Sequence, residues 1–341
     1  MDGAAIPTPP RPVGGLPRRA LAALGSLRLT VALLAALGAG VAAATFGGWP
    51  MTWPVALPVA GLALNLAVAL FTHPVFRANA ALTLFHVLLI ALMLLFALGR
   101  LTYFKGRIEV TEGQAFDGVP VEAEQGPWHP NRLDRIELVN QRFEIDYSPA
   151  TTIRGTRNAV RWRDAAGHWQ DAEIRENAPV ELLGYRIYVT GGKGFAPTFA
   201  WHADGRTVAG SVHLPRFPSD EHAQQAEWTL PDGRTRAWVA LRFDRPPLPS
   251  GQAARLEAPA ADAHRIVLRL ANETGEDVRH ELRPGDSVEL PGGRLEFTGT
   301  RLWMGYLLHY DRTVPWLLGI STLATLALAA HYAKKYGRRP W

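Results

Sequence analysis

Cysteine does not occur in the 341-residue sequence. Its absence excludes disulfide bonds, thiol catalysis, zinc sites with cysteine ligands and a C-x-x-C-H motif. The protein therefore cannot carry out thiol–disulfide exchange, and an exported domain must be stabilised by its own hydrophobic core. Motifs of hydrolase nucleophiles, P-loops and zinc proteases are also lacking, and Gly191-Gly-Lys-Gly194 departs from the P-loop pattern. We interpret these four residues as a loop between strands.

Charge is missing from a long region near the N-terminus. Residues 29–76 contain no Asp, Glu, Lys or Arg. A soluble fold does not need an uncharged stretch of this length, whereas membrane helices do. Residues 103–312 carry 26 basic and 30 acidic side chains, a balance of −4, whereas the rest of the chain carries +9. A nucleic-acid-binding surface would need a basic excess in the central block. The sequence therefore predicts a membrane protein that binds the lipid bilayer and no nucleic acid.

Four apolar runs have about the length that a helix needs to cross a bilayer. They cover Leu29–Phe46, Met51–Phe71, Ala80–Leu98 and Val314–Ala330. Both ends of the chain are basic, so the positive-inside rule predicts cytoplasmic termini and a large periplasmic domain on a bacterial inner membrane. A cleavable signal peptide is the alternative for the first run, but two more spans follow it directly.

The expected organisation has five parts. A cytoplasmic tail covers residues 1–26, three membrane helices cover 27–102, and an extracytoplasmic β-rich domain covers 103–312. A fourth membrane helix covers 313–333, and a basic cytoplasmic tail covers 334–341.

The central block reads as all-β. Apolar and polar residues alternate in Val180–Val189, Arg265–Leu270 and Arg294–Thr300, and Gly-containing turn signals separate such segments. The pattern predicts a sandwich-like β domain. Pro246–Gly251 is typical of a linker between two β subregions, and both one sandwich and two stacked sheets are compatible with the pattern.

An ionisable residue inside a membrane helix is the best lead to function. His86 lies six residues after Ala80, so at 1.5 Å per residue it is about 9 Å deep from the cytoplasmic end. One hypothesis is a histidine that packs between helices and hydrogen-bonds to a neighbouring span. The other is an axial ligand of haem iron, for which imidazole is well suited.

Three further histidines are weaker candidates. His331 lies at the cytoplasmic end of the fourth span beside Lys334 and Lys335, where it is an interfacial aromatic cation, a second iron ligand or a contact of haem propionates. His309 and His129 lie on the outer side, where a solvated histidine is the default interpretation. The other domain histidines show no metal-ligand spacing.

The layout and several local stretches resemble the ResB family, also called CcsB, of the System II cytochrome c biogenesis machinery. The stretches that carry the resemblance are Gly25–Leu34, His86 in the third span, Phe104–Gln114, Pro179–Val189, Pro284–Asp286, Leu295–Gly299, and Tyr310–Asp311 followed by Pro315–Gly319. They cover nearly the whole chain in the family's order, although the chain is a short variant and Val87 departs from the expected small residue.

The resemblance implies a membrane subunit that handles haem b. Together with a CcsA-type membrane protein it would convey haem across the membrane for attachment to apocytochrome c, with a thioredoxin-like thiol reductant as a further partner. His86 would be one axial ligand, and the CcsA-type partner would supply the other. Since the Cys-His motif for attachment lies on the substrate, the chain alone is not expected to be catalytic.

Two other functions are possible from the sequence. The first is a membrane-anchored β scaffold that docks an exported partner without a cofactor, with His86 as a packing residue. The second is a small-molecule transporter, which is disfavoured because no inverted repeat or pair of broken helices is found. A haem spectrum of the purified protein distinguishes the first from the haem-handling subunit.

Overall fold

The computed structural model describes residues 15–149, 152–164, 166–218, 223–248, 254–271, 277–290 and 292–337. The chain forms two compact units. One contains the helices together with Gln125–His129, and the other contains the strands. Each unit is treated separately below.

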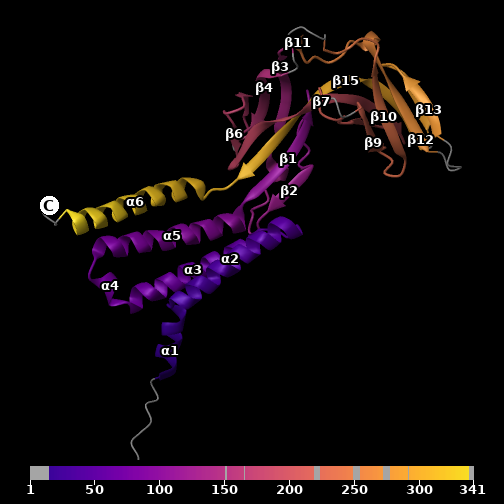
Figure 1. Cartoon of the computed structure of the whole chain (residues 1–341). Helices are drawn as coiled ribbons and strands as arrows, with labels where there is room; N and C mark the ends of the chain where they lie inside the picture. Colours follow the sequence, from indigo (N-terminus) through magenta and orange to yellow (C-terminus); the bar gives the residue numbers. More distant parts are fainter. Residues whose placement is uncertain are drawn as a thin grey trace, which may run out of the picture. The chain divides into compact units, whose positions relative to one another are not determined.

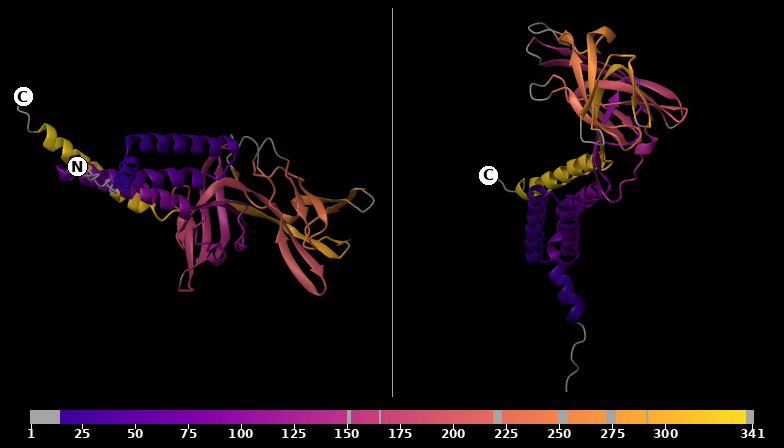
Figure 2. Two further views of the ribbon diagram at one scale, coloured as in Figure 1. Left: turned by 90° about the horizontal axis from the view of Figure 1, so that it is seen from below. Right: turned by 90° about the vertical axis from the view of Figure 1, so that its right-hand side faces the viewer.

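The first unit is helical (Figures 1 and 2). Its helices are α1 (Gly15–Leu24), α2 (Leu27–Gly47), α3 (Thr52–Thr72), α4 (Pro74–Arg77), α5 (Ala80–Thr102) and α6 (Val314–Tyr336). Within the described residues, α2, α3, α5 and α6 are long and apolar enough to cross a membrane. The prediction of four membrane helices and a large all-β domain is confirmed.

The four long helices pack in the order α2–α3–α5–α6, each against its neighbour. Little of their apolar surface is covered by the chain itself: in the most apolar stretch of α5 only 6% of the residues are buried. Apolar surface of this extent needs lipid or another membrane protein beside it. The unit is therefore a row of helices whose faces are open to both.

Exposed tryptophans gather at one end of this row. Trp49 and Trp53 flank the α2–α3 connection, and Trp316 lies in the first turn of α6. Trp128 belongs to the segment Gln125–His129, which lies against the end of α5. Indole rings favour the membrane–water interface, so these residues mark one boundary of the bilayer.

A buried asparagine joins α3 to the start of the row. The Asn65 side chain accepts a hydrogen bond from the Thr30 hydroxyl at 2.7 Å, and its Nδ2 donates to the carbonyls of Leu24 (2.5 Å) and Ser26 (3.2 Å). The Leu24 carbonyl has no helical partner at the end of α1, and Asn65 satisfies it in an apolar setting where it would be costly to leave unpaired. Asn65 therefore fixes the α1–α2 junction against α3.

The second unit contains three antiparallel sheets. The largest is seven-stranded, in the order β2-β1-β15-β7-β6 with β14 added to β15 and β8 to β7. Its strands are β1 (Phe104–Thr111), β2 (Glu122–Gln125), β6 (Val180–Leu182), β7 (Tyr185–Ala203), β8 (Arg206–Ser211), β14 (Ser287–Leu290) and β15 (Gly293–Tyr310). The long strands β7 and β15 pair along most of their length.

Two four-stranded sheets complete the unit. One has the order β13-β12-β10-β9, with β9 (Gln225–Thr229), β10 (Arg236–Phe243), β12 (His264–Ala271) and β13 (Asp277–Leu282). The other has the order β11-β3-β4-β5, with β3 (Leu138–Tyr147), β4 (Ile153–Arg163), β5 (Trp169–Ile174) and β11 (Ala254–Arg255). Two 3₁₀ turns cover Leu133–Arg135 and Ala261–Ala263.

One hydrophobic core spans all three sheets. The strands on either side of the expected linker are paired with each other, because β10 pairs with β12 and β3 pairs with β11. Residues 249–251 of that linker lie outside the described residues. The interpretation of two separate β subregions is wrong, since hydrogen bonds and core packing cross the division.

The interpretation of Gly191–Gly194 as a loop is also wrong, because these residues lie inside β7. The register of β7 against β15 shifts beside them, between Met304 and Tyr306, as in a β-bulge. The ring of Trp303 lies over the glycines: a Cβ on Gly194 would come 3.0 Å from the indole Nε1. Glycine is needed here because the strand bulges and the Trp303 ring lies close to it. The glycines do not indicate a loop.

A fully hydrogen-bonded polar network lies within the core. Asn158 donates to the side-chain oxygen of Asn140 at 2.8 Å and accepts from the Tyr306 hydroxyl at 2.9 Å. Asn140 in turn donates to the Val110 carbonyl at 3.0 Å. The network links β1, β3, β4 and β15, and burial raises the pKa of Tyr306 above its usual range.

Candidate functional site

The imidazole of His86 lies in the second turn of α5 and is held in one orientation. Its Nδ1 lies 2.7 Å from the carbonyl oxygen of Leu82, one helical turn earlier. A carbonyl only accepts, so Nδ1 carries the proton and Nε2 carries the lone pair. Within the described residues, no hydrogen bond or ion pair engages Nε2. Nε2 is thus the ring nitrogen that is available to bind a metal when the imidazole is neutral.

Aromatic rings flank this imidazole. The ring centroid of Phe76 lies 4.8 Å from that of His86 at 65°, and that of Phe85 lies 5.1 Å away at 84°. Phe76 belongs to α4, whose end is tied to α5 because the Thr83 hydroxyl donates to the Phe76 carbonyl. Edge-to-face contacts of this kind restrict ring rotation. A second-sphere hydrogen bond and two ring contacts are what an axial histidine needs for a fixed direction.

The His86 site fits haem chemically. It offers one neutral imidazole nitrogen in an apolar setting, and the faces of a porphyrin are apolar. Among the described residues, no group of three or more His, Cys, Asp or Glu side chains could hold a bare metal ion. The arrangement suits a metal that brings its own equatorial ligands.

His331 lies in the last two turns of α6, next to α5 in the row. Its Nδ1 is buried and has no hydrogen-bond partner among the described residues, and its ring contacts that of Tyr332 at 5.3 Å. The described residues provide no hydrogen bond or ring contact between His331 and His86. Lys334 and Lys335 follow in the same helix end. The structure thus places His331 near positive charge on the same side of the membrane as the start of α5.

His129 and His309 lie in other surroundings. The His129 Nδ1 lies 3.1 Å from the Thr102 carbonyl at the end of α5, and burial lowers the pKa of His129. His309 lies in β15 directly opposite Lys105 and Arg186. Neither arrangement forms a ligand site with other histidines in the described parts of the chain.

Two cavities among the described residues of the β unit are alternative candidate sites. The first, of about 530 Å³, is lined by Arg107, Glu109, His213 and Trp303 among others. His213 bonds to Glu109 through Nδ1 (3.1 Å) and to the Thr111 hydroxyl through Nε2 (2.8 Å), and its ring stacks on Trp303. The order carboxylate–imidazole–hydroxyl is that of a catalytic triad. Thr111 is only 2% exposed, however, so its hydroxyl cannot reach a substrate.

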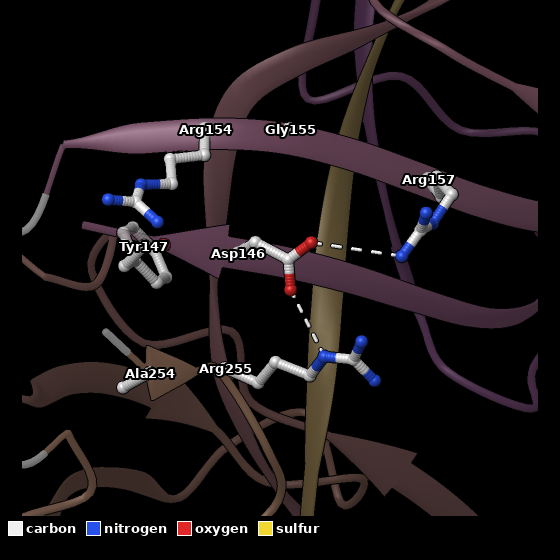
Figure 3. Close-up of a pocket in the computed structure, with 7 residues that line it drawn as sticks. All are labelled: Asp146, Tyr147, Arg154, Gly155, Arg157, Ala254 and Arg255. Carbon is white, nitrogen blue, oxygen red and sulfur yellow. Dashed lines mark hydrogen bonds and ion pairs between the residues drawn. The ribbon is translucent and has the colours of Figure 1, made fainter. Parts of the chain in front are cut away.

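The second cavity, of about 540 Å³, lies on the sheet that contains β3 and β4 (Figure 3). Asp146 pairs there with Arg255 at 3.0 Å and with Arg157 at 3.7 Å, and Glu144 pairs with the same two arginines. The arginines are about half exposed. This is a surface ion-pair network in which the acids neutralise the bases, and such pairs contribute little to stability.

The chain was compared with known protein families. A family model described as the ResB-like family matches residues 78–341. The chain belongs to the ResB-like family. This family is associated with cytochrome c biogenesis. The match includes α5 with His86, the whole β unit and α6 with His331, whereas α1, α2, α3 and α4 precede it. A search of the curated proteins finds no match.

The sequence predicted His86 as a candidate ligand but not the groups around it. Phe76 lies in a short segment between two apolar runs, and only the folded α4 brings it to the histidine. Asn65 could have been found, because it is a polar amide in the middle of a 21-residue apolar helix. An amide side chain at membrane depth needs a hydrogen-bond partner. The position of Asn65 therefore indicates a polar contact between helices.

Proposed function

We propose that this chain of the ResB-like family is a haem-handling membrane subunit of System II cytochrome c biogenesis. His86 binds haem iron within the membrane through Nε2. The orientation of this imidazole carries the proposal: Nδ1 is engaged by the Leu82 carbonyl, and Nε2 is left as an unprotonated donor beside two aromatic rings. Neutral imidazole with a fixed second-sphere hydrogen bond is the form that ligates iron.

A CcsA-type membrane protein supplies the second axial ligand. The row of helices supports this, because most of α5 is uncovered by the rest of the chain and accessible to another helix. Haem b is thus a transient substrate shared by two proteins. Apocytochrome c receives the haem. A thioredoxin-like reductant keeps the cysteines of the apocytochrome reduced, because this chain has no cysteine with which to reduce them.

Both termini lie in the cytoplasm, and the β unit lies in the periplasm. Basic residues at the end of α6 and the exposed tryptophans at the opposite ends of the helices support this orientation. Reporter fusions after Lys105 and after Tyr336 test it. A reporter that is active in the cytoplasm at the first site overturns this orientation.

His86→Leu tests the ligand. The variant, co-expressed with the CcsA-type partner, should fold but purify with little haem and support little cytochrome c maturation. His86→Ala should behave likewise, and added imidazole should partly restore the haem spectrum by occupying the vacated position. His309→Ala is the matched control and should keep the wild-type spectrum. A His86→Leu protein with undiminished haem and an unchanged spectrum, or a colourless wild type, refutes the proposal in favour of a scaffold without cofactor.

A further inference from the structure

A cavity of about 590 Å³ lies in the helical unit where α1 and α2 meet the end of α3. Its volume is in the range of sites for small molecules, about 300–1,000 Å³. Three residues of its lining are apolar side chains, and the others are Gly25, Ser26, Thr72 and His73. The apolar members are Leu21, Ala22 and Leu27.

The hydroxyl groups of this cavity are already engaged. Ser26 donates to the Ala23 carbonyl at 2.7 Å and accepts from the backbone of Leu29, and Thr72 donates to the Val68 carbonyl at 2.8 Å. His73 differs, because only its backbone N–H is engaged, with the Ala69 carbonyl. In the part of the chain that the structure describes, no hydrogen bond or ion pair involves its ring. His73 is thus an exposed imidazole on an apolar cavity.

A short segment connects this cavity to the His86 site. His73 caps the end of α3 and directly precedes α4. Phe76, three residues later, places its ring 4.8 Å from that of His86. The same stretch of chain therefore lines the cavity at one end and contacts the proposed iron ligand at the other.

We infer that this cavity is the site where haem first binds, with His73 as its first iron ligand, before haem moves to His86. The inference rests on the proposed function and adds the receiving site to it. In the transfer the iron exchanges one imidazole ligand for another and keeps its oxidation state. The apolar lining suits the faces of the porphyrin. The two propionate carboxylates of haem need cations beside them. Arg28 follows Leu27 directly and is exposed, so it is a candidate partner of a carboxylate.

The loading rate of the full-length protein, reconstituted with its CcsA-type partner in phosphatidylcholine nanodiscs, tests the inference. Ferrous haem is added to haem-free protein, and the Soret band is followed by stopped flow. His73→Ala should load about tenfold more slowly, the change expected for one lost ligand contact, and reach the same final spectrum because His86 is intact. Ala22→Trp, which fills the cavity and keeps His73, should be slowed similarly. Val75→Ala is the control: it lies next to the cavity in α4, is 63% exposed and is absent from the lining.

Wild-type loading rates in both His73→Ala and Ala22→Trp overturn the inference. Repetition with phosphatidylglycerol discs identifies a lipid site instead: if anionic lipid alone slows wild-type loading to the level of both variants, the cavity holds a headgroup and the inference is wrong. Failure of the proposed function can be told apart from failure of this inference. It appears as a final spectrum of His86→Leu that is the same as that of the wild type. A slow His73→Ala that reaches the wild-type endpoint, beside a His86→Leu that does not, supports both.

Discussion

The replacement of Gly126 by alanine should release the segment Gln125–His129 from the end of α5. Three hydrogen bonds hold this segment in place: the N–H groups of Gly126 and Trp128 donate to the carbonyls of Tyr103 (2.9 Å) and Leu101 (2.8 Å), and His129 reaches the Thr102 carbonyl. These carbonyls are at the C-terminus of a helix, where no intrahelical donor is left for them. The segment therefore caps α5 at the membrane boundary.

The size of the effect follows from the space at Gly126. A Cβ there would lie 2.2 Å from the Leu101 oxygen, 2.4 Å from the Leu101 carbon and 2.7 Å from the Arg100 oxygen. All three contacts are with backbone, so the segment must move and lose its hydrogen bonds. Two or three such bonds at about 1 kcal/mol each give a loss of about 2–3 kcal/mol.

Hydrogen exchange of the Trp128 amide measures this loss. A decrease of about 2–3 kcal/mol in the free energy of opening should accelerate exchange by about 30- to 150-fold. Gly155→Ala is the control, since no atom lies within 4 Å of its added Cβ, and it should leave exchange at Trp128 unchanged. Equal exchange at Trp128 in Gly126→Ala and the wild type would refute the account of this cap.

Three further predictions concern buried polar groups. Tyr306→Phe removes the donor to Asn158 and should lower the free energy of unfolding of the β unit by about 1–3 kcal/mol in chemical denaturation followed by circular dichroism; an unchanged midpoint contradicts this. Burial lowers the pKa of His264, whose Nε2 has no partner among the described residues. Stability should therefore fall as the pH drops below the ordinary value of 6.5 towards the folded pKa, and His264→Phe should flatten that dependence. Asn65→Leu removes the partner of Thr30 and of two carbonyls at the α1–α2 junction, and should cost about 2–3 kcal/mol, seen as faster amide exchange there but not in α6.

Local patterns were enough to predict the element types. An uncharged apolar run of about 20 residues has few alternatives to a membrane helix, and α3 covers Thr52–Thr72 where the sequence predicted Met51–Phe71. Strict alternation predicted strands such as Arg294–Thr300, which lies within β15. In both cases the period of the side chains determines which surface each residue meets.

Pairing of strands could not be predicted in this way. β1 pairs with β15 from Phe104–Tyr310 to Thr111–Trp303, across nearly the whole β unit in sequence. Nothing in either strand specifies a partner so distant, because alternation fixes a face and not a neighbour. The bulge at Gly191–Gly194 has the same origin: its glycines accommodate Trp303 from β15, and that ring is far away in the sequence.

The sequence left three roles open for His331: an interfacial aromatic cation, a second iron ligand and a contact of haem propionates. The end of α5 and the start of α6 lie together, since a Cβ on Gly99 would come 2.8 Å from the Thr313 hydroxyl. At 1.5 Å per residue, His86 lies about 20 Å along α5 from Gly99, and His331 lies about 27 Å along α6 from Thr313. Because the two helices are antiparallel neighbours, His331 is about 7 Å deeper than His86 towards the ends of the helices that carry Lys334 and Lys335.

Two axial ligands from neighbouring helices face each other across the iron, so they lie at about the same depth when the ring stands between the helices. On the proposed function, the offset of His331 favours a contact with a propionate at the edge of the ring, and Nε2 is the nitrogen available for it because Nδ1 is buried. His331→Leu should therefore weaken haem binding by about tenfold, as for one lost charge-assisted hydrogen bond, and leave the absorption spectrum of bound haem unchanged. Titration of His331→Leu with haem separates affinity from ligation. A change from the wild-type spectrum at saturation would instead make His331 the second axial ligand.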